Sequence, residues 1–414
     1  MGKIIVVGGG AAGMLAAYSA ASYGAEVLLL EKMNGVGKKI RITGKGRCNI
    51  TNNADIKGCI ANIPGNGAFL HSAFYQFFNE DIIRLLEEFG VETKVERGGR
   101  VFPVSDQAID VVNALQRMVI AMGGRIQTDT KVKSLVIADG AVQGVRLDSG
   151  EVLEADAVIV TTGGASYPGT GSSGDGYRMA KDVGHTIVPL TPSLVPLEIE
   201  EDWIQDLQGL SLRNVSVTAY VNDKKIDSDF GEMLFTHFGV SGPIVLSMSR
   251  KIALCLEEKQ EVILSLDLKP ALSEEQLDRR VQRDFEKYLR KQMKNALNDL
   301  LPQKLIPVVI DLAYLDEEKP IHQVTKEERL RLVHTIKHME MTVTKTRPMA
   351  EAIVTAGGVS TKEVNPKTMA SRVVNGLYFA GEVLDIDGYT GGFNLQAAFS
   401  TGYSAGKAAA ESLL

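Results

Sequence analysis

The chain has 414 residues, of which 44% are hydrophobic and 23% charged, with a net charge of −6. This composition is typical of a soluble globular protein with two or three domains. The acidic balance excludes an overall electrostatic attraction to nucleic acid or to an anionic membrane, although a local basic surface stays open.

The cysteine content argues against disulfides and metal. Cys48, Cys59 and Cys255 are too few and too scattered for a disulfide framework or a zinc site. No apolar run reaches the roughly 18 residues that span a bilayer, and the N-terminus is itself a predicted strand rather than a signal peptide. We therefore expect a cytoplasmic protein without a membrane segment and without a bound metal.

A glycine-rich turn follows the first predicted strand. Ile4 to Val7 is a short β-branched run, and Gly8, Gly10 and Gly13 follow it at GxGxxG spacing. Gly8 permits a tight turn, Gly10 lets the backbone approach a pyrophosphate, and Gly13 allows close helix packing. An ordinary glycine turn in an α/β protein is the alternative interpretation.

The residues after this turn support nucleotide binding. A small-residue helix begins near Ala11 and Ala12, and a second strand, residues 27–30, ends at Glu31. The helix N-terminus offers free N–H groups and a positive dipole end to a pyrophosphate. Glu31 can accept hydrogen bonds from both ribose hydroxyls, and an acid here argues against a 2′-phosphate. Strand, turn, helix, strand and acid together predict a dinucleotide site.

Residues 33–52 form a glycine-rich basic segment, predicted to be a loop with short extended pieces. Six cationic side chains lie in or just before it: Lys32, Lys38, Lys39, Arg41, Lys45 and Arg47. They are placed to balance a diphosphate. A solvated basic loop is the alternative.

The next segments alternate between helical and extended patterns. Residues 67–90 are predicted to be helical with Gly90 as a C-cap, 91–105 to form a hairpin, and 106–122 a further helix. Residues 124–164 alternate as a β-meander does. Its last strand, residues 157–160, leads into Thr161, Thr162, Gly163 and Gly164 and should bring the backbone near the nucleotide a second time. A glycine-rich stretch at 165–176 then precedes a helix at about 177–183.

The organisation changes near Val188, where prolines and strand-like segments begin. Residues 273–338 become helical and open with a capping box from Ser273 to Gln276. Between Arg279 and Lys304 eight Lys or Arg residues stand against three acids, which predicts a basic helix. A solvated helix face is one interpretation, and a surface for an anionic partner is the other.

The C-terminal segment returns to the pattern of the first. A strand at 377–380 leads to Gly381 and Glu382, and a small-residue helix starts near Asn394. The sequence therefore predicts an α/β fold in which a Rossmann-like nucleotide-binding domain is assembled from both chain ends and is interrupted by an insertion from about residue 190 to 346.

These motifs together resemble the two-dinucleotide-binding-domain flavoproteins. TTGG at 161–164 and GLYFAGEV at 376–383 resemble the later FAD motifs of that superfamily. GRCNITN, SYPGTGSSGDGY, GEMLFTHFGVSGPIVL and GEVLDIDGYTGGFNLQ resemble the BaiN/RdsA family of NAD(P)/FAD-dependent oxidoreductases over nearly the whole chain. One departure is Lys45 in TGKGRCN, where the family pattern has a glycine.

The resemblance implies a domain architecture. A Rossmann-like FAD-binding domain, residues 1–189 and 347–414, is expected to carry an inserted β-barrel subdomain, residues 190–272 and about 340–346, and an inserted helical subdomain, residues 273–339.

The same resemblance implies FAD binding and assigns residues to it. The expected cofactor residues are Gly8, Gly10, Ala11, Ala12, Gly13, Glu31, Lys32, Lys38, Lys39, Arg41, Gly46, Arg47, Cys48, Asn49, Val132, Thr162, Gly163, Gly164, Gly381, Glu382, Gly392, Phe393, Asn394, Leu395 and Gln396. The helix after Gly392 is expected to aim its N-terminus at the flavin and to stabilise the reduced, anionic form. An ordinary helix start after a glycine is the alternative.

The resemblance also implies a reaction, the reduction of an electron-poor C=C bond. Family activities include the reduction of uridine to dihydrouridine in large-subunit ribosomal RNA and the reduction of unsaturated steroid acids. Because no second βαβ unit that bears GxGxxG is recognised in the sequence, NADH or NADPH is expected as a transient donor in ping-pong kinetics. The alternatives are a reductase of a small unsaturated acid or ketone, and a non-catalytic flavin-binding redox sensor.

A protein acid must protonate the reduced substrate. The candidates are Cys48, His237, Tyr389 and Asp387. Arg47 and Lys45 are expected to lower the pKa of Cys48, although a buried inert cysteine is the commoner fate. His237 lies between Phe235 and Phe238 and could instead be a hydrogen-bonded core histidine. His185 and His338 have no motif around them.

Overall fold

The computed structural model describes residues 2–414 and divides the chain into two compact units. The first contains the chain up to Thr191 together with Met349–Leu414, and the second is Pro192–Pro348. Each unit has its own hydrophobic core.

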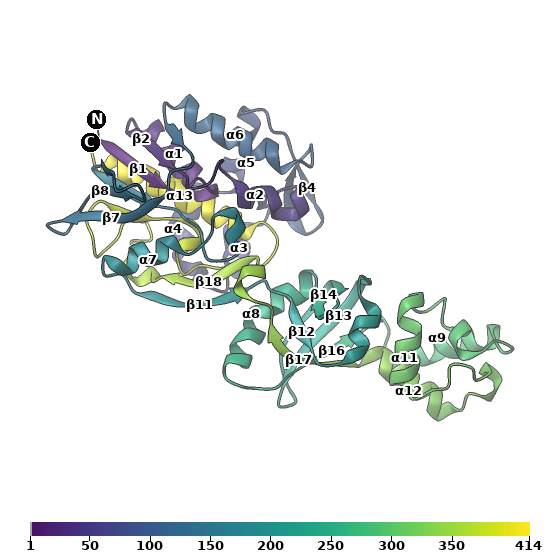
Figure 1. Ribbon diagram of the computed structural model, residues 1–414. Helices are drawn as coiled ribbons and strands as arrows, with labels where there is room; N and C mark the ends of the chain where they lie inside the picture. The colour runs from purple at the N-terminus through teal and green to yellow at the C-terminus, as the bar shows by residue number, and fades with distance from the viewer. Residues whose placement is uncertain (1) are drawn as a thin grey trace. The chain divides into compact units, whose positions relative to one another are not determined.

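A five-stranded parallel sheet in the order β19-β10-β1-β2-β6 is the centre of the first unit (Figure 1). Its strands are β1 (Lys3–Val7), β2 (Glu26–Leu30), β6 (Arg125–Gln127), β10 (Ala157–Val160) and β19 (Leu377–Phe379). Val7 pairs with Leu30 on one side and Val160 on the other, so these strands end level with one another. The chain passes from β1 through α1 to β2 on one side, and β10, on the other side, comes much later in the chain, so the strand order changes direction at β1. In such sheets ligands bind in the crevice outside the carboxyl ends of the strands at this point.

Helices and small antiparallel sheets surround the parallel sheet. The helices are α1 (Ala11–Ser22), α2 (Lys38–Ile42), α3 (Ile56–Ala61), α4 (His71–Gln76), α5 (Asn79–Glu88), α6 (Ala108–Ala121), α7 (Asp175–Asp182) and α13 (Phe393–Glu411). The antiparallel strands are β3 (Thr51–Asn52), β4 (Thr93–Glu96), β5 (Arg100–Pro103), β7 (Val132–Ala138), β8 (Ala141–Leu147) and β9 (Val152–Glu154), and β11 (Ile187–Ser193) lies beside β18 (Val354–Val359).

Helix α1 is packed closely against α13, although they come from opposite ends of the chain. A Cβ on Gly402 would lie 2.3 Å from the Ala12 carbonyl oxygen, and one on Gly406 would lie 2.2 Å from that of Ala16. Only glycine fits at this separation, so the small residues of both helices are explained by their contact. This contact fixes the N-terminal turns of the two helices within one body.

Two predictions about the first unit were wrong in part. Residues 124–164 are not one meander, because only β7, β8 and β9 pair antiparallel, whereas β6 and β10 join the parallel sheet. Alternation of apolar residues does not distinguish these pairings. Residues 33–52 include the helix α2 and a 3-10 turn, Thr43–Gly46, besides a short extended piece.

The second unit is built on a closed barrel in the order β12-β15-β14-β13-β16-β17. Its strands are β12 (Leu197–Ile199), β13 (Ser211–Val221), β14 (Lys224–Phe235), β15 (Gly239–Ser241), β16 (Val262–Asp267) and β17 (Met339–Thr346). Alternate residues of β13 and β16 are buried inside, as the period of a strand requires. Helix α8 (Pro243–Glu257) packs against β14, and the strand pattern did not predict it.

A helical segment is inserted between β16 and β17 (Figure 1). It contains α9 (Glu274–Lys287), α10 (Met293–Ala296), α11 (Ile306–Leu312) and α12 (Lys326–Lys337). The capping box is confirmed, since Ser273 Oγ accepts from Gln276 N at 3.2 Å and Ser273 N donates to Gln276 Oε1 at 3.0 Å. Because α9 ends at Lys287, the prediction of one basic helix over residues 279–304 was wrong.

Long-range pairing explains this break. Met293 N donates to Lys319 O at 2.9 Å, and Ile321 N donates to Lys291 O at 3.0 Å. The chain after α9 therefore takes an extended course against a distant segment, which helix propensity cannot foresee. The predicted fold class, a Rossmann-like domain with an inserted barrel and helices, is confirmed. No helix within residues 2–414 is long and apolar enough to cross a membrane.

Candidate functional site

The glycine turn after β1 brings three different constraints together. Gly8 has φ +107°, and a Cβ there would lie 2.6 Å from the Thr161 carbonyl oxygen. On Gly13 a Cβ would lie 1.8 Å from the Gly8 carbonyl oxygen. A Cβ on Gly10, by contrast, would have no described atom within 4 Å. The tight turn and the close helix packing are thus confirmed, and the space at Gly10 is open toward the crevice.

The first turn of α1 carries the donors of this turn. Gly10 is the N-cap residue and supplies no side chain, and Met14 N makes the first intrahelical bond, to Gly10 O at 3.0 Å. The amides of Ala11, Ala12 and Gly13 precede that bond, so the helix itself has no carbonyl for them. Together with the dipole, they make this end of α1 suited to an anion.

Glu31 is held rigidly at the end of β2. Its carboxylate accepts from Gly9 N at 2.7 Å and from Met33 N at 2.8 Å. A carboxylate has about four lone-pair sites, so two stay open for ribose hydroxyls. The Glu31 carbonyl accepts from Thr130 N at 2.9 Å, which brings the start of β7, with Val132, to the same edge.

The end of β10 contributes a hydroxyl that the protein leaves unused. Thr161 Oγ1 donates within the turn, 3.0 Å from Val7 O and 2.9 Å from Gly8 O. The neighbouring Thr162 Oγ1 is buried and has no hydrogen-bond partner among the described residues. A buried hydroxyl without a partner is costly, so it indicates a place for a ligand atom.

Glu382 ends a polar relay that the sequence did not reveal. Its carboxylate lies 2.8 Å from Lys39 Nζ and accepts from Thr355 N at 2.9 Å and Ser166 Oγ at 3.2 Å. A Cβ on Gly164 would lie 2.8 Å from Glu382 Oε1, so the β10 turn passes directly over this carboxylate. GEV and TTGG were visible as motifs, but nothing local marks Ser166 or Thr355.

Three of the six cations predicted as counter-charges for a diphosphate pair with acids of the protein itself, namely Lys32, Lys39 and Arg47. Lys32 Nζ lies 2.6 Å from Asp175 Oδ2. The guanidinium of Arg47 pairs with Glu96 and Asp106 and lies 4.2 Å above the Phe102 ring. Hydrogen bonds from Lys94 and Arg47 lower the pKa of Asp106.

Cys48 does not have the activated thiol that was predicted. It is fully buried, and burial raises the pKa of its thiol to about 12, against a weaker lowering by the hydrogen bond with Thr43. Arg47 is occupied by Glu96 and Asp106, so it does not stabilise a Cys48 thiolate. A buried, neutral cysteine is the structural outcome.

The N-terminus of α13 is set by a second obligatory glycine. Gly392 has φ +99°, and a Cβ there would lie 2.3 Å from Thr51 O. With its amide oxygen turned toward donors, Asn49 accepts from Gly392 N at 2.9 Å. The Asn394 side chain accepts from Gly388 N and donates to Gly388 O, both at 2.8 Å, and so holds the preceding loop.

Gln396 supports this helix end from inside the core. Its fully buried amide accepts from Thr51 Oγ1 at 2.6 Å and donates to Ser400 Oγ at 2.9 Å. Ser400 Oγ in turn donates to Phe77 O at 2.7 Å. Because Gln396 N also bonds Gly392 O, we infer that Gln396 positions the helix rather than touching a cofactor.

The remaining predicted residues fall in both units. The other expected cofactor residues lie in the first unit: Lys38, Arg41, Gly46, Gly163, Gly381, Phe393 and Leu395. Tyr389 is half-buried there, with its N bonded to Asn62 O at 2.9 Å, and Asp387 is fully buried. His237 belongs to the second unit, where it is exposed and its ring centroid lies 5.0 Å from that of Phe238. It is therefore not a core histidine.

The first unit fits FAD by its own chemistry. The open space at Gly10, the amides that begin α1 and the orphaned Thr162 hydroxyl offer donors to a dinucleotide, and Glu31 offers acceptors. None of these features needs a basic side chain, which explains how the salt-bridged lysines and Arg47 are compatible with the site.

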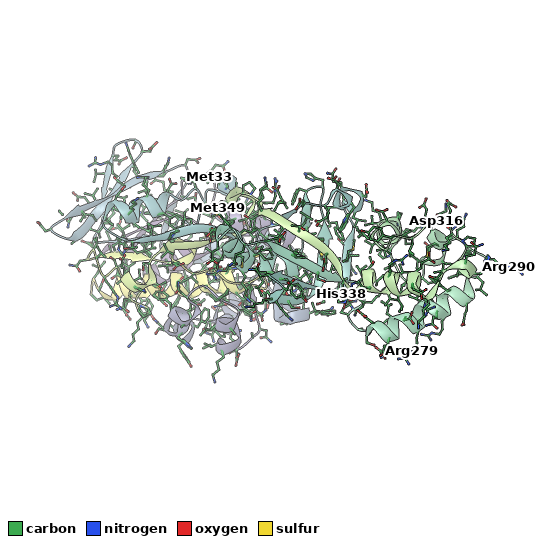
Figure 2. The ribbon with its side chains drawn as sticks, turned by 90° about the horizontal axis from the view of Figure 1, so that it is seen from below. Met33, Arg279, Arg290, Asp316, His338 and Met349 are labelled. Carbon is green, nitrogen blue, oxygen red and sulfur yellow. The ribbon has the colours of Figure 1, made fainter. Side chains whose placement is uncertain are left out.

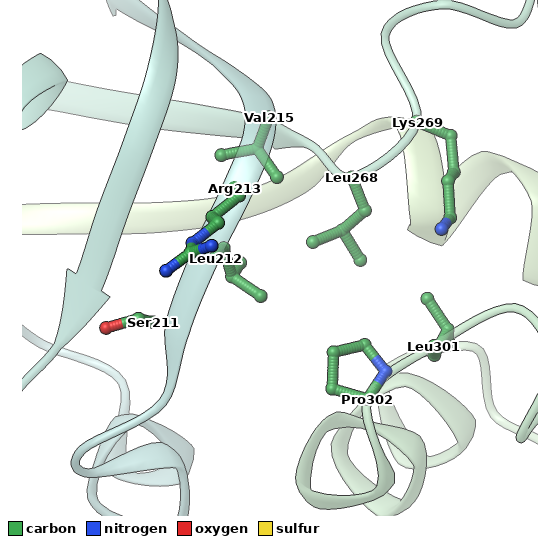
Figure 3. Close-up of a pocket in the computed structure, with 8 residues that line it drawn as sticks. All are labelled: Ser211, Leu212, Arg213, Val215, Leu268, Lys269, Leu301 and Pro302. Carbon is green, nitrogen blue, oxygen red and sulfur yellow. The ribbon is translucent and has the colours of Figure 1, made fainter. Parts of the chain in front are cut away.

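A separate cavity of about 290 Å³ lies in the second unit (Figure 3). Leu268 and Leu301 face each other across it, and Arg213 and Lys269 stand at its edge. Burial, followed by the neighbouring Arg280, lowers the pKa of Lys269. The cavity contains none of the predicted site residues.

Comparison with known proteins shows which family the chain resembles over nearly its whole length. Residues 2–408 match the family model described as HI0933-like protein Rossmann domain. The 3-dehydro-bile acid delta(4,6)-reductase of Clostridium scindens is 36% identical over 99% of this chain and 100% of its own length. The ribosomal RNA dihydrouridine synthase of Haemophilus influenzae is 33% identical over 97% of this chain and 96% of its own.

A solved structure supports the fold alone. The open conformation of a flavocytochrome c3 fumarate reductase aligns with a TM-score of 0.51 at 17% identity, covering 100% of this chain and 78% of that one. The predicted family resemblance is confirmed by the sequence relatives.

Proposed function

The chain belongs to the HI0933-like family and is an FAD-dependent oxidoreductase, and from this premise we propose that it uses NADH or NADPH to reduce an electron-poor C=C bond. One observation carries the proposal. Two curated relatives matched over nearly their whole length are named for reductions, one of a bile acid and one that yields dihydrouridine, and both saturate a carbon–carbon double bond. Such names disfavour a non-catalytic redox sensor.

The first unit supplies the binding chemistry. FAD, when bound, supplies hydride transfer. The N-terminus of α1 and the space at Gly10 would hold a pyrophosphate, and Glu31 would hold the adenosine ribose. The N-terminus of α13, which Gly392 and Gln396 hold in place, would direct amides and a positive dipole end at a developing negative charge.

The substrate gains a hydride at one carbon and a proton at the next. Cys48 is poorly suited to deliver that proton, because a fully buried thiol with a pKa of about 12 would have to be recharged through the core. Tyr389, half-buried in the loop before α13, is the better candidate because it lies in the same unit as the cofactor residues, whereas a role of the exposed His237 of the second unit stays a prediction. Tyr389→Phe and His237→Gln would remove the proton that each side chain could transfer, the phenol O–H or the imidazole N–H, while keeping a side chain of similar size.

The nicotinamide donor would share the site with the substrate. GTGSSG at 169–174 has the GxGxxG spacing, but it does not open a second βαβ unit, because the helix α7 after it leads to β11, which pairs with β18 and not with the parallel sheet. NADH or NADPH would therefore have to leave before the substrate enters. Parallel lines in double-reciprocal plots, the sign of ping-pong kinetics, would support this order.

Two substrate classes compete. The higher identity of the bile acid reductase favours a small unsaturated acid or ketone. Exposed cations on the helical segment favour uridine in large-subunit ribosomal RNA, namely Arg279, Arg283, Arg290 and Lys291. Figure 2 shows the side chains of Arg279 and Arg290 directed outward from this segment.

Nucleoside mass spectrometry separates the two classes. Large-subunit ribosomal RNA from a host lacking the gene should lose dihydrouridine, and complementation should restore it, if RNA is the substrate. An unchanged content would leave the flavin chemistry standing and move the proposal to the small molecule.

The salt dependence of RNA binding tests the basic surface. The logarithm of the RNA association constant falls linearly with the logarithm of the salt concentration. Glutamine in place of Arg279, Arg283, Arg290 and Lys291 should make this slope less negative by roughly 0.7 to 0.9 for each lost phosphate contact. Arg280→Gln is the matched control, because its Nε already lies 2.9 Å from Asp284 Oδ2. An equal effect of the control would remove the exposed cations from the proposal.

A further inference from the structure

The helical segment of the second unit brings two histidines and a carboxylate together. His334 lies near the end of α12 and His338 directly follows that helix, one turn later, whereas Glu274 is the first residue of α9. His338 Nε2 lies 2.9 Å from Glu274 Oε1, and His334 Nδ1 lies 3.8 Å from the same oxygen. One atom of each side chain lies within 4.8 Å of the other two.

Packing of α9 against α12 holds these side chains in place. Leu277 and Val281 of α9 are buried, as are Leu332 and Ile336 of α12. On the same helix pair, Arg329 Nε lies 2.7 Å from Asp278 Oδ1, so an ion pair repeats the contact further along the interface.

The start of α9 is fixed independently. The capping box of Ser273 and Gln276 closes the first turn, in which Glu274 lies. The nearly buried Lys337, also of α12, donates to Lys269 O at 3.1 Å and Leu272 O at 2.6 Å. The helix pair therefore fixes the backbone positions of Glu274 and the two histidines, from which the exposed side chains reach one another.

We propose that Glu274, His334 and His338 bind a divalent transition-metal ion of the Zn²⁺ type. In a tetrahedral site with ligand distances of about 2.0–2.1 Å, the ligand atoms are roughly 3.4 Å apart. The observed 2.9 and 3.8 Å lie on either side of that value, so small rotations about side-chain bonds complete the site. Two imidazoles and one carboxylate favour Zn²⁺, Ni²⁺ or Cu²⁺ over Mg²⁺ and Ca²⁺, which prefer oxygen ligands.

The ion would join the beginning of α9 to the end of α12, two points 60 residues apart in sequence. An ion that binds the folded segment and not the unfolded chain stabilises the folded segment by mass action. The site shares no residue with the FAD cradle, so it is independent of the flavin chemistry. His338 has no motif around it in the sequence, although its spacing from His334, four residues, is the one that places two side chains on one face of a helix.

Calorimetric titration of the full-length, FAD-loaded protein with ZnCl₂ tests the site. We expect one Zn²⁺ site per chain. His334→Ala, His338→Ala and Glu274→Gln should each lower the Zn²⁺ affinity by at least roughly 10- to 100-fold, because loss of an outer-shell partner alone has an effect of that size. His322→Ala is the matched control, since His322 is an exposed histidine of the same segment outside the cluster. It should bind Zn²⁺ as the wild type does.

Hydrogen exchange locates the ion without using activity. Zn²⁺ should slow amide exchange at the beginning of α9 and the end of α12 in the wild type and in His322→Ala, but in none of the three cluster variants. Circular dichroism checks that each variant is folded, and all four positions are exposed. Absence of saturable binding, or binding that survives the cluster variants and disappears in Cys255→Ser, would overturn the proposal.

Discussion

Gly10→Ala should weaken FAD binding and leave the fold intact, whereas Gly13→Ala should destabilise the fold. The two glycines are only three positions apart in one turn. Gly10 has φ −83°, which alanine adopts readily, and no described atom lies within 4 Å of a Cβ there. Gly10→Ala should therefore leave the folded apoprotein intact. The added methyl group would instead occupy the space that we assign to the pyrophosphate.

The magnitudes follow from the contacts. Alanine is a weaker N-cap than glycine but restricts the unfolded chain, so the net change in unfolding free energy for Gly10→Ala should stay below about 1 kcal/mol. A hydrogen bond to a charged group contributes about 1.5–3 kcal/mol, so displacing one such bond should weaken FAD binding roughly 10- to 150-fold. For Gly13→Ala, the Cβ lies 1.8 Å from Gly8 O, so the destabilisation should reach at least about 3 kcal/mol.

Urea unfolding of the apoproteins and FAD titration by fluorescence quenching measure the two effects separately. Gly90→Ala is the reciprocal control, because Gly90 has φ +82° at the end of α5. It should lose about 1 kcal/mol and keep its FAD affinity. Unchanged FAD affinity in Gly10→Ala, with the fold intact, would refute the placement of the pyrophosphate.

Three further predictions concern buried groups. Gln396→Leu should lower the free energy of unfolding in urea by about 2–3 kcal/mol, because the Thr51 hydroxyl loses its buried acceptor. A loss below about 0.5 kcal/mol, roughly the size of a surface substitution, would show that the hydrogen bonds of Gln396 are dispensable for stability. Iodoacetamide at neutral pH should label the half-buried Cys255 before the buried Cys48, whose pKa is about 12. Mass spectrometry of the peptides gives the order of labelling, and labelling of Cys48 first would contradict this prediction. Burial lowers the pKa of His185, so the folded state binds fewer protons and the free energy of unfolding should fall as the pH drops below about 6.5. In His185→Asn the urea midpoint should depend less on pH across that range. An unchanged pH dependence would assign the effect to other groups.

The parts of the fold that could be predicted are those specified by neighbouring residues. The β-branched run before Gly8, the glycine spacing and Glu31 lie within one short stretch, and each has a local physical meaning. The same holds for the capping box at Ser273, whose two hydrogen bonds join residues three apart. Such features need no knowledge of the tertiary structure.

The features that escaped prediction depend on contacts between distant residues. Arg47 was expected to serve the cofactor or Cys48, but its partners are Glu96 and Asp106, some 50 to 60 positions away. Lys39 likewise meets Glu382, 343 positions later. Burial of Cys48 has the same origin, since the exposure of a side chain is decided by everything packed around it. Charge and spacing alone therefore predicted cations but not their partners.

Anaerobic absorption spectroscopy of the purified, FAD-loaded protein tests the central claim most directly. NADH or NADPH should bleach the oxidised flavin spectrum, and large-subunit ribosomal RNA that lacks dihydrouridine, or an unsaturated keto acid, should then restore it. A spectrum that neither nicotinamide changes would contradict the proposed reductase, and one that is bleached but that no C=C substrate restores would contradict the proposed substrate chemistry.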